Sequence, residues 1–534
     1  MPYIKTSLFG PALFILLCLQ EPIGQGQQTP AAAPTIRVTS RLVFLDVTVL
    51  DKKGLPVVTG LDKEDFTITE DKKPQRIFSF EAPETHVADA SAAENNPSGK
   101  APVTVFVLDL LNSRFEDFAY IRYSVRKYLD AQPTHLTSPA ELMVLGNKSL
   151  EMVQGYTRSK ADLLSALNHI PAELPYKMMN GSFYAERFGQ SIDALQQIAL
   201  QNKGIPGRKN VVWVGHGGPN IYTEALTGPI VDELNSYVHD TTNMLVDARI
   251  SLFVIYPGLQ IRGQGITLTE VEAGADLGDV DPFTGDINFG VFVNETGGNL
   301  FYNRNDVDAE IRRSLELGAK YYTLTYQPQE GEPNGKFRRI RVTLRDPNLH
   351  VITKTGYFAP DKNAPSDPRQ QSMFNIAEAA RSTVPFAALE MTVENLVRHP
   401  DASTVEFTVV LKPKNIGWQA ADNEKSTTNL MVAAVSLSNR RDILASRLES
   451  LTISTNTQDA SRLATTLTRL PIRIRVPRKT QDVRVAIQVG DSGRIGTVEL
   501  DRKMIDAAPE SPTPDPKLTT STERKSPDTG PDLK

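Results

Sequence analysis

Apolar runs alternate with segments of helical spacing across the middle of the chain, residues 102–305. Residues 103–108 are almost continuously apolar, which is typical of a strand covered on both faces of its sheet. The following segment, 114–130, places its apolar side chains at helical spacing. Further strands are predicted at 141–146, 150–156, 210–215, 249–257 and 297–302, and further helices at 159–169, 184–202, 230–248 and 306–318. This order predicts a doubly wound, Rossmann-like α/β domain.

The regions on either side have the pattern of β-structure. Residues 36–82 alternate polar and apolar positions, and residues 384–500 form short strands between polar turns, which suits a β-sandwich. Strands within 321–360 are expected to fasten onto the central domain. We therefore predict a multidomain α/β plus β protein. Its parts are a signal peptide (1–26), a small β unit (36–82), a linker (83–101), the α/β domain (102–320), a β-strand extension (321–360), a β-sandwich-like domain (384–500) and a disordered tail (505–534).

Residues 1–26 have the features of a secretory signal peptide. Lys5 supplies the positive charge, and the apolar core, 8–19, is too short to span a bilayer and is interrupted by Pro11. No later segment has the length of a transmembrane helix. We expect an exported protein, located in a periplasm, on a cell surface or in the medium, with no transmembrane segment in its mature chain.

The single cysteine, Cys18, lies inside the predicted signal. A lipoprotein signal would place a small residue before the cysteine, but Leu17 stands there, so an ordinary apolar signal residue is the favoured interpretation. Once the signal is removed, the chain has no cysteine. That excludes disulfides, thiol nucleophiles and cysteine-based zinc sites.

Charge and motif content argue against two classes of function. The formal net charge of -5 gives no support for nucleic-acid binding, which favours basic faces. The sequence has no His-Glu-x-x-His pattern and no Gly-x-Ser-x-Gly nucleophile elbow. The Gly-rich segment 215–219, GHGGP, lacks the Gly-Lys-Ser/Thr of a phosphate-binding loop and predicts a tight turn after a strand. We therefore expect a protein that is not an enzyme.

Polar side chains follow the buried strand 103–108 directly. Asp109 ends the apolar run, and Asn112 and Ser113 come before the next predicted helix. The carboxyl ends of strands in an open α/β sheet are where such folds hold ligands. A second interpretation is structural: Asp109 and Ser113 would cap the helix, each contributing on the order of 1 kcal/mol.

With these elements placed, the chain resembles the bacterial VWFA-related domain family known mainly from Acidobacteria. The stretches that carry the resemblance span residues 40–360 and are LDVTVLDKKGLPVVTGLDKEDFTITEDKKPQRIFSF, VFVLDLLNS, GRKNVVWVGHGGP, ETGGNLFYNRNDVDAEIRRSL, YYTLTYQP and KTGYFAP. The resemblance implies an exported protein with a von Willebrand factor A-like domain. It implies no enzyme activity and no particular ligand.

The resemblance also implies a place for a divalent cation. In such domains a first loop supplies Asp-x-Ser-x-Ser, a second a Thr near a helix start, and a third an Asp after a buried strand. Here Asp109 and Ser113 match the first loop, but Leu111 replaces its middle Ser, and His216 stands where the third-loop Asp belongs. Imidazole suits transition metals better than Mg²⁺, so the resemblance implies a degenerate metal-ion-dependent adhesion site.

In the second loop Ser182 is the best match, and Ser191 is the alternative. The candidate ligands for Mg²⁺ or Mn²⁺ are therefore Asp109, Ser113, Ser182 and His216. Asn112 could donate an oxygen, but its spacing does not fit the pattern. A separate acidic loop, 276–288, could attract Ca²⁺, yet its spacing is not that of an EF-hand, and a solvated acidic loop is favoured.

These observations favour an exported, non-enzymatic protein that binds an unknown protein partner or acts as a scaffold. The carboxyl edge of the α/β domain would make the contact, and its dependence on metal is doubtful. Two alternatives from other classes stay open. One is a metal-dependent hydrolase that uses the same edge, and the other is a structural envelope component that assembles with itself.

Overall fold

The computed structural model describes residues 42–86, 100–171, 177, 183–257, 286–328, 334–360, 368–399, 403–412, 416–421, 425–456, 467–490 and 492–511. The predicted signal peptide, Ser182 and most of the linker and of the acidic loop lie outside these residues. Within the described residues, no helix combines the length and the apolar character needed to cross a membrane.

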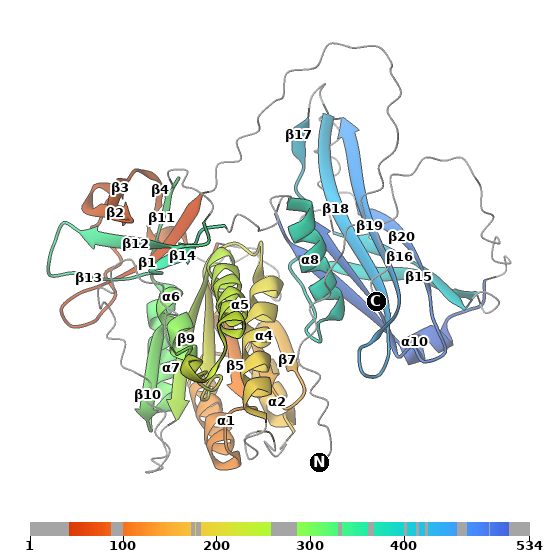
Figure 1. The fold of residues 1–534 in the computed structure, drawn as a ribbon, viewed down its shortest axis with the longest axis horizontal. Coiled ribbons are helices and arrows are strands. Elements are labelled where there is room, and N and C mark those ends of the chain that lie inside the picture. Colours follow the sequence, from red (N-terminus) through yellow and green to blue (C-terminus); the bar gives the residue numbers. More distant parts are fainter. Residues whose placement is uncertain are drawn as a thin grey trace. The chain divides into compact units, whose positions relative to one another are not determined.

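A six-stranded sheet forms the middle of the chain, in the order β10-β9-β8-β5-β6-β7 (Figure 1). All neighbouring pairs are parallel except β6 and β7, which are antiparallel. The strands are β5 (Val103–Asp109), β6 (His135–Leu145), β7 (Leu150–Ser159), β8 (Lys209–Val214), β9 (Ile250–Pro257) and β10 (Asn299–Arg304). This is the strand order of a doubly wound sheet with an antiparallel edge strand, so the predicted mixed α/β class is confirmed.

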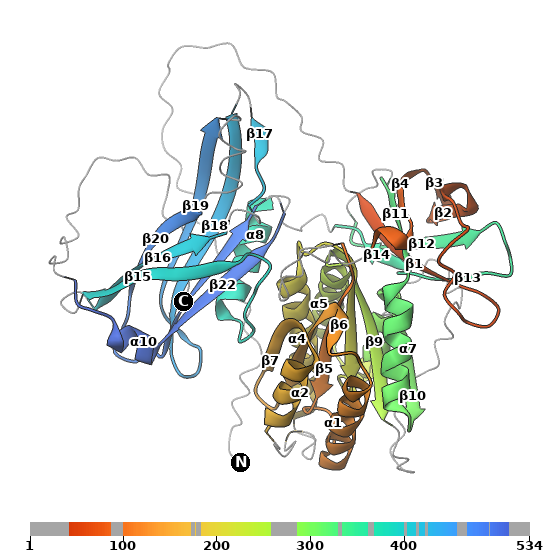
Figure 2. The ribbon, with the colours of Figure 1, turned by 180° about the vertical axis from the view of Figure 1, so that it is seen from behind.

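Helices cover both faces of this sheet, and each face has its own apolar core (Figure 2). One core includes side chains of α4 (Tyr184–Asn202), α5 (Gly228–Asp247) and α6 (Phe289–Glu295). The other includes side chains of α1 (Phe115–Asp130), α2 (Lys160–His169) and α7 (Val307–Ala319). Burial on both faces explains why the residues of β5 are almost all apolar.

Strands from residues 36–82 and 321–360 combine into shared antiparallel sheets. One sheet has the order β13-β1-β11-β4 and the other β14-β12-β2-β3. Sequence analysis placed these strands in two separate parts, but β11 pairs with β1 and β4, and β12 pairs with β2. The strands are β1 (Val43–Leu50), β2 (Phe66–Glu70), β3 (Lys73–Gln75), β4 (Ile77–Glu81), β11 (Tyr322–Tyr326), β12 (Phe337–Leu344), β13 (His350–Ile352) and β14 (Gly356–Phe358).

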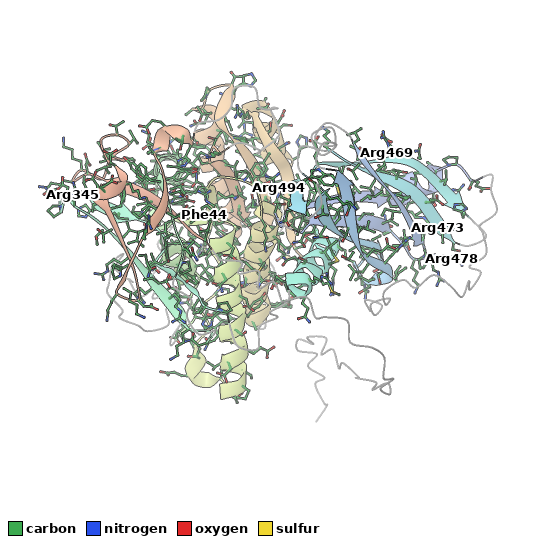
Figure 3. The ribbon with its side chains drawn as sticks, turned by 90° about the horizontal axis from the view of Figure 1, so that it is seen from above. Phe44, Arg345, Arg469, Arg473, Arg478 and Arg494 are labelled. Atoms are coloured by element: carbon green, nitrogen blue, oxygen red, sulfur yellow. The ribbon has the colours of Figure 1, made fainter. Side chains whose placement is uncertain are left out.

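The described strands between residues 391 and 501 form two further antiparallel sheets that share an apolar core. Strand β20 shows the alternation that builds it: Leu470 and Ile472 are buried, whereas Arg469 is exposed (Figure 3). The first sheet contains β15 (Met391–His399), β16 (Thr404–Leu411) and β20 (Thr468–Arg475). The second contains β17 (Gln419–Ala421), β18 (Lys425–Leu437), β19 (Ile443–Asn456), β21 (Asp482–Val489) and β22 (Ile495–Asp501).

Two helices of the carboxyl-terminal part were not predicted from the sequence. Helix α8 (Pro368–Arg381) contributes Ile376 and Ala379 to a core shared with β18 and β21. Helix α10 (Arg502–Ala507) begins at the N-cap Asp501, whose side chain accepts a hydrogen bond from the backbone of Met504. The predicted disordered tail starts inside α10, where Ile505 is buried, and residues 512–534 lie outside the described part.

Candidate functional site at the carboxyl edge of the central sheet

Asp109 is the last residue of β5, and its side chain is fully buried. Its Oδ1 accepts a hydrogen bond from the backbone N–H of Asn112 at 2.9 Å. Its Oδ2 accepts from the indole Nε1 of Trp213 at 3.1 Å and from the backbone N–H of Gly217 at 2.9 Å. Burial raises the pKa of Asp109, and the donors on Asn112 and Trp213 oppose that rise. The carboxyl group therefore ties the loop after β5 to β8 and to the loop that follows β8.

The side chain of Asn112 lies beside this carboxyl group and is buried. Its amide Nδ2 lies 3.2 Å from Oδ1 and 3.1 Å from Oδ2 of Asp109. The same nitrogen lies 3.0 Å from Oγ of Ser191 on α4. The sequence offered Asn112 as a possible oxygen donor to a metal, but in the structure its side chain donates hydrogen bonds through its nitrogen.

Helix α4 supplies two side chains to this edge. Ser191 is buried, and its hydroxyl donates to the carbonyl of Arg187, one turn earlier, at 2.8 Å. The Nε–H of Arg187 donates to the Oδ1 of Asn112 at 3.1 Å. Burial lowers the pKa of Arg187, and the nearby Asp109 carboxyl acts in the opposite direction. Of the two second-loop candidates, the structure brings Ser191 to the Asn112 amide, which contacts Asp109, whereas Ser182 lies outside the described residues.

The Gly-rich loop after β8 is shaped by its close approach to Asp109. Gly215 has a φ of 144°, and a Cβ at that residue would lie 2.5 Å from the Cβ of Asp109. Gly217 has a φ of 70°, and a Cβ there would lie 2.5 Å from the ring of Phe289. The two glycines thus allow the backbone N–H of Gly217 to reach the carboxyl group of Asp109. The Gly-rich segment therefore acts as a tight turn after β8.

His216 faces Asp117 and not Asp109, with which the predicted metal site would group it. Its Nε2 lies 3.6 Å from Oδ2 of Asp117 on α1, and its ring centroid lies 3.7 Å from that of Tyr256. The Nε–H of Arg114 donates a hydrogen bond to Oδ2 of Asp117 at 3.0 Å. Burial favours a higher pKa for Asp117, but His216 and Arg114 outweigh it and hold the pKa below its ordinary value.

Ser113 is fully buried, and its Oγ has no hydrogen-bond partner among the described residues. Helix α1 begins after the N-cap Arg114, which makes no side-chain cap bond. The hydrogen bonds to Asp109 come from Asn112, Trp213 and Gly217 and not from the first turn of α1. The prediction that Asp109 and Ser113 cap this helix is therefore wrong, because the backbone of Leu110 and Leu111 donates to Leu145 at the end of β6 and the helix begins only after Arg114.

As arranged, these residues do not fit a hard divalent cation. Such an ion needs about six oxygens with free lone pairs directed at one point. Both oxygens of Asp109 instead face N–H donors, and Leu111 is buried in the apolar core and offers only its backbone. Across the part of the chain that the structure describes, no three His, Asp or Glu side chains come together as a metal site.

The rim of this edge carries exposed aromatic side chains from three different segments. Phe115 at the start of α1 is 45% exposed, Tyr184 at the start of α4 is 38% exposed, and Tyr222 after β8 is 55% exposed. Tyr184 donates through its hydroxyl to the carbonyl of Asn220 at 2.5 Å, which joins α4 to the loop that carries Tyr222. Together Phe115, Tyr184 and Tyr222 form the aromatic rim of this edge.

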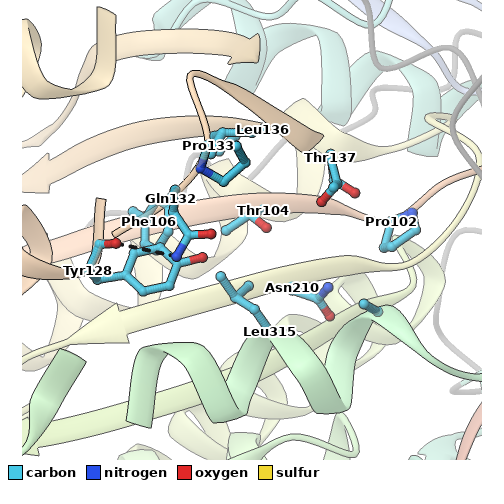
Figure 4. A pocket seen from close by; sticks show the side chains of 13 residues that line it. Pro102, Thr104, Phe106, Tyr128, Gln132, Pro133, Leu136, Thr137, Asn210 and Leu315 are labelled. Atoms are coloured by element: carbon cyan, nitrogen blue, oxygen red, sulfur yellow. Dashed lines mark hydrogen bonds between the residues drawn. The ribbon is translucent and has the colours of Figure 1, made fainter. Parts of the chain in front are cut away.

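A cavity of about 130 Å³ lies at the opposite, amino end of the sheet (Figure 4). Thr104 of β5, Tyr128 of α1, Asn210 of β8 and Leu315 of α7 are among the residues that line it. Burial raises the pKa of Tyr128 to about 12. The polar groups in its lining are hydroxyls and amides, so the cavity offers no acid–base pair for catalysis.

Comparisons with known proteins find no matching family model and no matching curated protein. Among solved structures, proximal thread matrix protein 1 from the mussel byssus matches at 9% identity and a TM-score of 0.25, over 41% of this chain and 48% of that protein. The chain thus spans about half of that relative. The SpRpn10 VWA domain matches at 16% identity and a TM-score of 0.16, over 30% of this chain and 90% of that domain.

Manganese-loaded TRAP protein from Plasmodium vivax matches at 8% identity and a TM-score of 0.24, over 67% of this chain and 94% of that protein. The pilus adhesin SpaC from Lactobacillus rhamnosus GG has the same identity and TM-score, over 75% of this chain and 54% of that protein. Likenesses at this level carry no argument.

Proposed function

We propose that the central domain is a von Willebrand factor A-like module that binds a protein partner through the carboxyl edge of its sheet. The aromatic rim is the observation that carries this proposal. Phe115 and Tyr184 begin the helices α1 and α4, Tyr222 follows β8, and all three side chains remain exposed. Tyrosine, phenylalanine and arginine are enriched in protein interfaces, where a few such residues provide most of the binding energy.

The proposed role is not enzymatic. Among the described residues of the edge, the hydroxyls of Ser113 and Ser191 are buried, so neither offers a nucleophile to a substrate. His216 is directed at Asp117 and Tyr256. A hydrolase at this edge would need a reactive group that a substrate can reach, and the described residues do not supply one there.

We also propose that the protein is exported. This part of the proposal rests on residues 1–26, which have a positive charge and a short apolar core. A module that binds a partner outside the cell must keep its fold without disulfides, because the chain after Cys18 has no cysteine. The two apolar cores of the central domain provide that stability through packing.

Site-specific photocrosslinking tests the partner surface. A benzophenone amino acid is introduced at Tyr222 in one protein and at Tyr123 in another. Tyr123 is a matched control because it is also an exposed tyrosine, on the side of α1. In cells that produce the protein, we expect a specific crosslinked protein from position 222 and none from position 123. Equal crosslinking at both positions would contradict the proposal.

The identified partner is then purified and its Kd measured by calorimetry. The combined variant F115S, Y184S and Y222S should bind at least tenfold more weakly, since each interface aromatic contributes on the order of 1 to 2 kcal/mol. Y123S should bind as the unchanged protein does. An unchanged Kd for the combined variant would show that the partner uses another surface.

A further inference from the structure

The amide nitrogen of Asn112 lies at the centre of a small group of oxygens. Two belong to Asp109 at the end of β5, at 3.2 and 3.1 Å, and one belongs to Ser191 on α4, at 3.0 Å. The group joins two elements that lie 79 residues apart in the sequence. Oxygens of carboxylates and hydroxyls gathered from separate elements are also what a hard cation collects. The N–H₂ group therefore occupies the position from which a cation would hold these elements together.

Arg187 fixes which end of the amide faces the acid. Its Nε–H can only donate, and it donates to the Oδ1 of Asn112 at 3.1 Å. The nitrogen of Asn112 must then point toward Asp109, because the opposite orientation would place an amide oxygen against the carboxyl oxygens. The guanidinium also brings a full positive charge toward Asp109, whose attraction favours the charged form of Arg187. Arg187 is thus a positioning residue for the amide.

The other hydrogen bonds to Asp109 leave its carboxyl oxygens few free lone pairs for a metal ion. Trp213 and Gly217 donate to Oδ2 of Asp109, and the backbone of Asn112 donates to Oδ1. With the two contacts of the Asn112 amide, the carboxyl group accepts five hydrogen bonds. A cation would have to displace the amide, and only then could the unpaired hydroxyl of Ser113 join the other oxygens.

We propose that the side-chain amide of Asn112, aimed by Arg187, takes the place of a divalent cation at this edge. The edge keeps its shape through fixed polar contacts, and loss of the amide uncovers a cation site made of Asp109, Ser113 and Ser191. The substitution does not depend on the proposed function. Its consequence, that the partner binds equally well in the presence of a chelator, does rest on that function.

The decisive variant is Asn112→Asp, which keeps the shape of the side chain and replaces the amide nitrogen by oxygen. Two carboxyl groups about 3 Å apart repel each other when both are ionised, so the variant should require a cation. We expect its thermal midpoint to fall and to rise again by roughly 5 °C with Mn²⁺ in hundredfold excess over its Kd. The unchanged protein should show no shift with Mn²⁺.

Two matched variants show whether the response belongs to this cluster. Asn168→Asp makes the same change at an exposed position of α2 and should not respond to Mn²⁺. The double variant N112D and D109N lacks the Asp109 carboxyl group on which the proposed cation site is built, and it should lose the response. If Asn112→Asp does not fold, Asn112→Ala takes its place, since removal of the amide alone should also create a response to Mn²⁺.

Terbium luminescence locates the ion. The chain has two tryptophans, and the indole of Trp213 contacts Asp109 directly, so Tb³⁺ at this edge should be sensitised by Trp213. We expect Trp-sensitised emission from Asn112→Asp or Asn112→Ala, its loss in a W213F background, and none from the unchanged protein. Saturable Mn²⁺ binding by the unchanged protein that D109N abolishes would overturn the proposal. So would folded Asn112 variants that ignore both ions.

These measurements are independent of the partner. A rim that binds no partner would leave the cation responses as expected and would contradict only the proposed function. Cation binding by the unchanged protein, together with partner binding at the rim, would instead overturn only the role of Asn112.

Discussion

Two acids are fully buried in neighbouring strands of the central sheet, and their surroundings differ. Asp109 ends β5 and accepts five hydrogen bonds. Glu141 lies inside β6, in register with Val105 of β5. Its Oε2 accepts from Gln201 Nε2 at 2.9 Å, and its Oε1 has no hydrogen-bond partner in the described structure. Burial raises the pKa of Glu141 to about 8.

The difference shows two ways to place an acid where water does not reach. Burial raises the pKa of both acids, and donors from three segments converge on Asp109 and oppose the rise there. At Glu141 burial outweighs the donors and raises the pKa to about 8, so this acid is mainly protonated at neutral pH. An acid that accepts several hydrogen bonds holds the loops that donate them together. A protonated acid needs fewer hydrogen-bond donors from its neighbours. The first arrangement marks the edge that we propose for partner binding, and the second belongs to the interior.

Removal of the Asp109 carboxyl group should have the largest effect. Asp109→Ala leaves the buried donors of Asn112, Trp213 and Gly217 without an acceptor, so we expect a loss of about 3 to 5 kcal/mol in the free energy of unfolding. Urea denaturation measures it, with Trp418 replaced by Phe so that Trp213 alone reports on the central domain.

The control for this loss is Asp232→Ala, which removes an exposed acid of α5 and should cost less than about 0.5 kcal/mol. A loss of similar size in the two variants would show that the contacts of Asp109 do not stabilise the fold.

Glu141→Gln should change the pH dependence of stability. The folded protein keeps a proton on Glu141 up to a pKa of about 8, while the unfolded chain releases it near the ordinary value of 4.5. Between these values the unfolded state binds fewer protons, so the stability of the unchanged protein falls as pH rises and levels off above about pH 8. Between pH 6 and 8, the free energy of unfolding of the unchanged protein should fall by roughly 2 kcal/mol relative to that of E141Q.

Urea denaturation of both proteins at each pH measures this difference, and other titrating groups cancel in the comparison. Glu151→Gln, at an exposed position of β7, should show no such difference. Parallel pH profiles for the unchanged protein and E141Q would mean that Glu141 is already ionised in the fold.

Ser191→Ala should have a smaller effect. The variant removes one acceptor of the Asn112 amide and the hydroxyl that donates to the carbonyl of Arg187, which should cost about 1 kcal/mol. Ser165→Ala, at an exposed position of α2, is the matched control for urea denaturation. If Ser191→Ala cost as much as Asp109→Ala, the serine and not the acid would be the centre of the cluster.

The smallest effect on stability is expected at the aromatic rim. Y222S exchanges an exposed side chain and should alter the free energy of unfolding by less than about 0.5 kcal/mol. The same urea experiment measures it. A large loss would assign Tyr222 to the packing of the fold and would weaken its proposed role in partner binding.

Much of the central fold could be predicted because its signals are local. The apolar run ending at Asp109 becomes β5, and the helical spacing over 114–130 becomes α1, with bounds that agree within one residue. The pairing of β11 and β12 with strands near the start of the chain could not be predicted, because contacts over such separations leave no mark in local periodicity.

At the site, sequence alone found Asp109, Ser113 and His216 but not the contacts that define their roles. Asn112 was noted for its oxygen, and its nitrogen is what faces the acid. The contact of Arg187 with Asn112 could not be predicted, since the sequence does not distinguish this arginine from a solvent-exposed residue of an amphipathic helix.

The sequence by itself determined the mixed α/β class, the buried strand and the polar residues at its carboxyl end, since burial and periodicity act over neighbouring residues. The tertiary structure alone decided what those polar residues do. Trp213, Gly217 and Ser191 reach Asp109 and Asn112 only when β8 and α4 have packed beside β5. Whether a buried oxygen is free for a ligand depends on which donors the fold brings to it, and those donors lie far apart in the chain.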